Sequence, residues 1–298
     1  MINAASRHIF SKTGKVAYGL LLFPFVTLLI PSSASAAAPR VGILVGAKVK
    51  QLQAAASIVS KRKDIQAEIY RLYEGTRELD RFQLDTRSQR HDAVVALGAK
   101  AHAFALQKIT LINYAATFVL KENSKNVVPM NPSPEAWADL MNETLPRGSA
   151  IGTIAIRPDT RASFNQLEKA LQRKGLKLYV NEINSPTEIP RALQQLVKST
   201  QAFYYPRKKS LLNKKIAVKI LKDAHAANIP IYAFSPQIVA AGATFGLSFD
   251  TAQLADSAVK KALGKGNPSP ATLHYNNGRL KSLRISLPRK YSLRTKKH

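Results

Sequence analysis

The sequence predicts an α/β protein with two lobes, and three observations support this. Short apolar runs recur along the chain, and each is followed by roughly 10–15 residues with helical spacing, which is typical of a parallel sheet covered by helices. A connection rich in Pro and Asn, residues 123–134, interrupts this series. A second α/β series of similar size begins near Ala150, so we expect two lobes that exchange a late segment.

The first series begins with Val41–Val45, a fully apolar run that predicts a strand buried on both faces. Apolar residues at 52, 55, 56 and 59 then share one helical face. The other elements expected here are strands at 65–70, 93–97 and 111–115 and a helix at 99–107.

In the second series, Ser133 and Pro134 predict the cap and first turn of a helix that buries Trp137. Strands are expected at 150–156, 176–180, 202–205, 229–234 and 244–249, and helices at 164–171, 189–197, 212–224 and 250–262. The dipeptide Asn277-Gly278 between 273–275 and 280–285 predicts a closing β-hairpin.

Residues 1–38 have the pattern of a secretory signal peptide. Arg7, Lys12 and Lys15 precede an apolar stretch at 16–30, and two A-x-A sites follow it. We expect cleavage after Ala36 or Ala38 and a periplasmic location, because the chain has no Cys for a lipid anchor. An uncleaved membrane anchor is the alternative, and the run of small residues disfavours it.

Composition argues against several kinds of chemistry. The 298 residues contain no Cys, which excludes disulfides, thiolate metal sites and Cys nucleophiles. The six His form no metal-like pair, and neither a G-x-S-x-G nor a P-loop pattern occurs, so we expect no enzyme, metal or cofactor. The formal charge is +27, with basic runs at 207–222 and 279–298 that could meet an anionic envelope surface. Nucleic acid is not an expected partner, because export and the absence of a recognition module both oppose it.

Several stretches resemble the substrate-binding proteins of ABC transporters, in the tryptophan- and tyrosine-binder-like branch with a type I periplasmic-binding-protein fold. The stretches are Asp92–Gly98, Ile151–Val180, Ala227–Tyr232 and Gly242–Asp250 with Gly264-Lys265-Gly266. The resemblance implies two Rossmann-like lobes with parallel sheets, a small-molecule ligand between them and a membrane permease as partner. We predict one lobe from 39–128 with 248–266, the other from 129–247 with 267–288, and a basic tail at 289–298.

Candidate ligand residues follow the carboxyl ends of the predicted strands, where ligands of such sheets bind. Lys100 and Arg207 lie in turns where the resemblance implies small hydroxyl and acidic residues, so with Arg157 they favour an anionic ligand; solvent-facing side chains are the alternative. The hydroxyl or carboxyl groups of Thr160 and Asp250 also suit helix caps, and the rings of Tyr205 and Phe234 also suit core packing. The full candidate set is Gly46, Lys48, Gly98, Lys100, Thr117, Arg157, Thr160, Tyr205, Arg207, Phe234 and Asp250.

The leading functional hypothesis is therefore a periplasmic solute-binding protein. The alternative is an envelope interaction or sensory protein that kept this fold and lost transport, and the altered ligand loops favour it. A third hypothesis is a cationic surface that binds anionic polymers.

Overall fold

The computed structural model describes residues 37–109, 112–119, 124–208, 211, 213–266, 269–288 and 295–298. The predicted signal peptide therefore lies outside the described residues, apart from Ala37 and Ala38. Within the described part of the chain, no helix combines the length and the apolar character that crossing a membrane requires.

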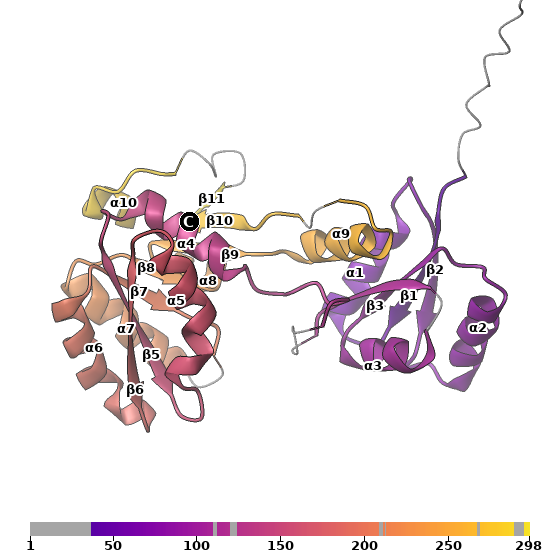
Figure 1. Cartoon of the computed structure of the whole chain (residues 1–298), viewed down its shortest axis with the longest axis horizontal. Coiled ribbons are helices and arrows are strands. Elements are labelled where there is room, and N and C mark those ends of the chain that lie inside the picture. Colours follow the sequence, from indigo (N-terminus) through magenta and orange to yellow (C-terminus); the bar gives the residue numbers. More distant parts are fainter. Residues whose placement is uncertain are drawn as a thin grey trace, which may run out of the picture. The chain divides into compact units, whose positions relative to one another are not determined.

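The first lobe is built on four parallel strands in the order β2-β1-β3-β4. Their bounds are Arg40–Val45 for β1, Gln66–Arg71 for β2, Ala93–Leu97 for β3 and Asn113–Thr117 for β4. Helices α1 (Lys50–Ser60) and α9 (Thr251–Ala262) cover one face of this sheet, and α2 (Thr76–Arg87) and α3 (Ala99–Lys108) cover the other (Figure 1). Strand β3 is buried along its whole length because it lies between these two layers.

The second lobe is built on a seven-stranded sheet in the order β11-β10-β9-β8-β7-β5-β6. Strands β5 to β9 pair in parallel, β10 is antiparallel to β9, and β11 is parallel to β10. Their bounds are Ala150–Ile156 (β5), Lys177–Ile183 (β6), Ala202–Tyr205 (β7), Ile231–Ala233 (β8), Phe245–Ser248 (β9), Thr272–Tyr275 (β10) and Thr295–Lys297 (β11).

Helices cover both faces of the second sheet as well. Helices α4 (Pro134–Thr144), α5 (Asn165–Gln172) and α10 (Asn277–Leu283) pack on one face. Helices α6 (Ile189–Ser199), α7 (Lys214–Ala226) and α8 (Pro236–Ala240) pack on the other. The apolar stripe predicted for α6 is confirmed, since Ile189, Ala192, Leu193 and Leu196 are its buried residues.

Helix α9 belongs to the first lobe although it is late in the sequence. It follows β9 of the second sheet, packs against α1 and β4, and is followed by β10 of the second sheet. An ion pair between Arg62, which follows α1, and Asp256 of α9 adds to this packing. The exact lobe boundaries stay a prediction.

One prediction for the C-terminal region is wrong. The expected hairpin is absent, because Asn276 caps a helix: its side-chain oxygen accepts from the N–H of Arg279 (3.0 Å), and α10 then runs to Leu283. Strand β10 pairs with β9 and β11 instead. Residues 295–297 of the predicted basic tail form β11, a short edge strand.

Candidate ligand-binding site

A cavity of about 270 Å³ lies at the carboxyl ends of β7 and β8, where parallel sheets of this kind bind ligands. Its walls come from the connection before α4, from the start of α5 and from the loops after β7 and β8. The lining residues are Asn131, Pro132, Pro134, Trp137, Ser163, Phe164, Gln166, Leu167, Tyr204, Pro206, Arg207, Lys208 and Phe234. Its size suits a small solute.

Aromatic side chains form much of this wall. The rings of Trp137 and Tyr204 meet edge to face, with 5.3 Å between their centroids. Phe234 is half-buried and packs edge to face on Tyr205 with 5.8 Å between centroids, so it stands between the core and the cavity. Such rigid aromatic surfaces bind the apolar body of a ligand at low entropic cost.

The two cations of this wall differ in what neutralises them. The ammonium group of Lys208 lies 3.2 Å from Asp159 Oδ1 and 5.6 Å from the centre of the Phe164 ring, so it is already paired. Arg207 is exposed, and within the described residues its guanidinium makes neither an ion pair nor a hydrogen bond. Of these two cations, Arg207 is therefore the one whose charge can contact an anion.

A second cavity, of about 500 Å³, shares Asn131, Pro132, Arg207 and Phe234 with the first. It adds the cap of α8, the end of β9 and one face of β10 and β11. The residues it adds in the second sheet and its loops are Ser235, Pro236, Gln237, Ser248, Phe249, Asp250, Thr272, His274 and Lys296.

Some of the candidate residues of the second lobe line the two cavities, and others do not. Arg207 and Phe234 line both cavities, and Asp250 lines the larger one. Arg157 is exposed and lines neither cavity. Thr160 stands at the cap position of the 3₁₀ turn Arg161–Phe164 without accepting a capping hydrogen bond.

Tyr205 and Asp250 have the structural roles that were the alternatives to ligand contact. The Tyr205 side chain is fully buried, its hydroxyl donates to the Leu211 carbonyl (2.6 Å), and burial raises its pKa to about 12. Asp250 forms a capping box with Gln253. The side-chain oxygen of each residue accepts a hydrogen bond from the backbone N–H of the other, at 2.8 Å.

The candidates of the first lobe gather at the carboxyl edge of the first sheet. The N–H of Gly46 donates to the Leu97 carbonyl (3.0 Å), and the N–H of Gly98 donates to the Thr117 carbonyl (2.9 Å). A Cβ on Gly46 would lie 2.8 Å from the backbone nitrogen of Ala101, so this close backbone approach requires glycine.

The lysines of this edge have different surroundings. Lys48 is exposed in the loop before α1. The Lys100 ammonium donates to the Leu72 carbonyl (3.3 Å), which holds it against the first lobe. Neither residue lines the two cavities described above.

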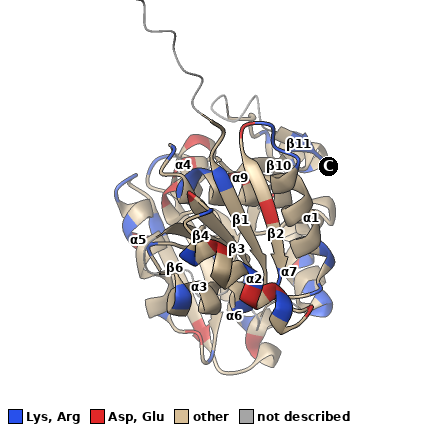
Figure 2. Ribbon diagram, turned by 90° about the vertical axis from the view of Figure 1, so that its right-hand side faces the viewer, with Lys and Arg blue, Asp and Glu red and all other residues tan. Residues whose placement is uncertain are grey.

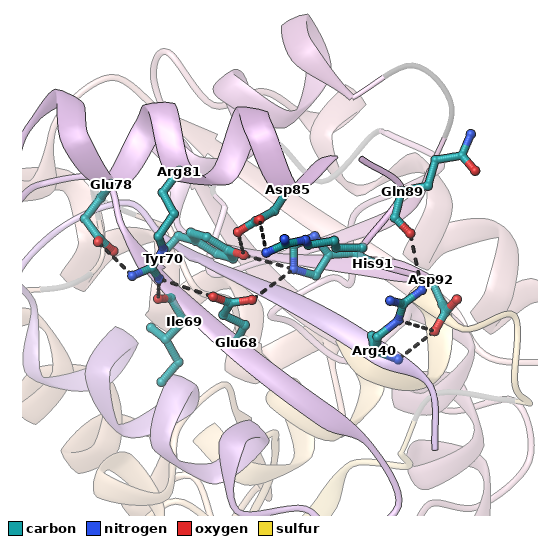
Figure 3. A network of polar contacts seen from close by, with 11 residues as sticks. Arg40, Glu68, Ile69, Tyr70, Glu78, Arg81, Asp85, Gln89, His91 and Asp92 are labelled. Carbon is teal, nitrogen blue, oxygen red and sulfur yellow. Dashed lines mark hydrogen bonds and ion pairs between the residues drawn. The ribbon is translucent and has the colours of Figure 1, made fainter. Parts of the chain in front are cut away.

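A buried polar network occupies the α2 side of the first lobe (Figure 3). The hydroxyl of Tyr70 donates to Asp85 Oδ2 (2.7 Å) and lies 3.0 Å from Nε2 of His91. The Arg81 guanidinium stacks 4.6 Å from the centre of the Tyr70 ring, and Arg90 pairs with Asp85 at 3.1 Å. Burial is the main cause that lowers the pKa of His91. We assign this network to stability, because its hydrogen bonds connect α2 to β2 and to the residue His91 before β3.

The positive charge is spread over the surface. Lys and Arg residues lie on α3, α5 and α7 and on β11 (Figure 2). Many of them have acidic partners, including Lys219 with Asp223 and Arg161 with Glu168. No group of three or more His, Asp or Glu that could hold a metal occurs among the described residues.

Sequence reasoning missed several residues of these cavities. It selected Tyr205 for stacking, whereas Tyr204 lines the smaller cavity. The two side chains point to opposite faces of β7, and the sequence does not say which face the ligand shares. His274 and Lys296 were missed because they meet only when β11 pairs with β10.

The chain belongs to a family of transport proteins. A family model described as ABC transporter substrate binding protein matches residues 93–271, which is more than half of the chain. The chain is therefore a member of this family, and its two-lobed α/β architecture is the type I periplasmic-binding fold. No curated protein matches it in sequence.

Solved structures are similar to this chain at low sequence identity. A ligand-free, open substrate-binding protein with adhesive properties from Clostridium difficile is 15% identical with a TM-score of 0.62, covering 87% of this chain and 99% of that one. A domain from Streptococcus pneumoniae in complex with L-Trp is 14% identical with a TM-score of 0.47, at the same coverage. A solute-binding protein from Agrobacterium vitis with bound allitol is 14% identical with a TM-score of 0.41, covering 83% of this chain and 98% of that one.

Proposed function

We propose that this protein is an exported, periplasmic solute receptor that binds a small ligand at the carboxyl edge of its second sheet and delivers it to an ABC permease. Membership in the family of ABC transporter substrate-binding proteins supports solute binding. We propose a permease because proteins of this family work with the permease of an ABC transporter. We further propose that the two lobes close on the ligand by bending at the connections between them. The proposal assigns binding and not catalysis to the protein.

The observation that carries the proposal is the position of Arg207. It follows a central parallel strand, lines both cavities and has no acidic partner among the described residues. Aromatic rings stand beside it. A guanidinium next to an apolar wall favours a small ligand that has both an anionic group and an apolar part.

We expect the Arg207→Ala variant to bind this ligand about tenfold or more weakly, because one charge-assisted hydrogen bond is worth roughly 1.5–3 kcal/mol. A thermal-shift screen of small metabolites on the mature protein identifies the ligand. Calorimetry then measures the affinity of this ligand for the unchanged protein and for the Arg207→Ala variant. The melting temperature without ligand should be nearly unchanged, because the side chain is exposed.

Arg191→Ala is the matched control, since Arg191 is an exposed arginine on α6 that lines neither cavity. Equal affinity in the Arg207→Ala and Arg191→Ala proteins would reject this site. The alternative of an envelope interaction protein predicts no stabilising metabolite in the screen. Sequencing the N-terminus of protein from the periplasmic fraction checks export, with Ala37 or Pro39 as the expected first residue.

A further inference from the structure

Residues on three neighbouring strands at the edge of the second sheet share one face. Strand pairing places Ser248 of β9 opposite Thr272 of β10, and His274 of β10 opposite Lys296 of β11. Residues two apart on a strand point to the same side, so these four side chains form one patch, and all four line the larger cavity. The next residues, Leu273 and Leu247, point to the opposite face and are fully buried.

A chain of hydrogen bonds runs through this patch. Ser248 Oγ lies 2.9 Å from His274 Nε2, and His274 Nδ1 lies 3.1 Å from His298 Nε2. The His274 side chain is almost fully buried, and both of its ring nitrogens are engaged. The imidazole therefore has a fixed orientation, and it fixes the Ser248 hydroxyl at the cavity wall.

We propose that residues 295–298 complete the ligand site, with Lys296 as a second cation of the larger cavity, which Arg207 also lines, and with His298 orienting the His274–Ser248 pair, so that this cavity takes a small oxyanion such as a carboxylate or a phosphate group. The inference rests on the proposed function, because it names the ligand chemistry of the same edge of the sheet. It goes further by giving the basic C-terminal strand a role in binding.

The charges around the cavity favour this ligand chemistry. Within the described residues, Arg207 and Lys296 make no ion pair. The rim also holds one carboxylate, Asp250, whose Oδ1 is engaged in its capping box. The hydroxyls of Ser248 and Thr272 provide neutral hydrogen-bonding groups beside these cations.

Titration of His274 adds a dependence on pH. Burial is the main cause that lowers its pKa to about 4, and the neighbouring His298 and Lys296 lower it further, while Asp250 raises it. A bound oxyanion would offset the repulsion from His298 and Lys296 and would raise the pKa of His274. Anion binding should then take up a proton, so it should strengthen as the pH falls.

The test is calorimetry of the mature protein with inorganic sulfate, whose charge is constant over the pH range used, and with inorganic phosphate and acetate as further probes. We expect Lys296→Gln to weaken sulfate binding about fivefold or more at pH 7. Lys297→Gln is the matched control, because Lys297 is the next residue on the same exposed strand and does not line the cavity. This control should bind within about twofold of the unchanged protein.

The pH series is the second measurement. We expect the unchanged protein to bind sulfate more tightly at pH 5.5 than at pH 7.5, and His274→Gln to lose much of this gain. Equal effects of the two lysine substitutions, or no heat with any of the three anions, would overturn the inference. If Arg207→Ala weakens metabolite binding while Lys296→Gln does not, the proposed function stands and only the role of residues 295–298 falls.

Discussion

Replacing Asp85 by Ala is expected to destabilise the protein by about 2–4 kcal/mol. The carboxylate is buried at 3% exposure, and it accepts hydrogen bonds from the Tyr70 hydroxyl (2.7 Å) and from the Arg90 guanidinium (3.1 Å). Removing it leaves a fully buried hydroxyl with His91 as its remaining partner. It also opens a small void beneath α2.

Urea denaturation of the purified mature protein measures this loss. Asp80→Ala is the control, because Asp80 is an exposed carboxylate on the same helix. It should change the free energy of unfolding by less than about 0.5 kcal/mol. The account of the network would be wrong if both substitutions had the same small effect.

Acidification from pH 7 to pH 4 should lower the stability of the folded protein, and His274 should contribute about 3 kcal/mol of this loss. The pKa of His274 falls from 6.5 to about 4 on folding, so the unfolded chain binds the proton at a higher pH than the folded one. The contribution is fully present above pH 6.5 and is lost as the pH falls towards 4. Burial also lowers the pKa values of His91 and His102, which act in the same direction.

The measurement is the urea midpoint at several pH values for the unchanged protein and for His274→Gln. The variant cannot take up this proton, so its stability should fall less steeply between pH 6.5 and pH 4. The absolute stability of the variant at pH 7 does not enter the comparison. Only the slope of stability against pH reports the proton uptake by His274. Parallel pH profiles would show that His274 is not buried as the structure places it.

Most strands and helices of this fold follow from local patterns in the sequence. The run 150–156, which is apolar apart from Thr153, predicts β5 with its observed bounds, and the residues Ser133 and Pro134 predict the start of α4. Helix α2 was missed because its stripe is mostly polar and its buried positions include a charged residue, Asp85. Asn277-Gly278 was misassigned, since the same small polar residues serve turns and helix caps.

The sequence predicts those residues of the candidate site that directly follow a single buried strand. Arg207 and Phe234 follow single buried strands, and both line the cavities as the strand-end rule predicts. Lys296 could not be found in this way, because it reaches the cavity only through the pairing of β11 with β10. These strands lie far along the chain from β7, which Arg207 follows. Such long-range pairing has no local signal.

The position of the bound ligand tests the central claim most directly. The measurement is a crystal structure of the mature protein with the solute that stabilises it most in the screen. We predict that the ligand lies at the carboxyl ends of β7 and β8, with an anionic group on the Arg207 guanidinium and its body against Phe234. A ligand bound away from this edge, with Arg207 in solvent, would contradict the account.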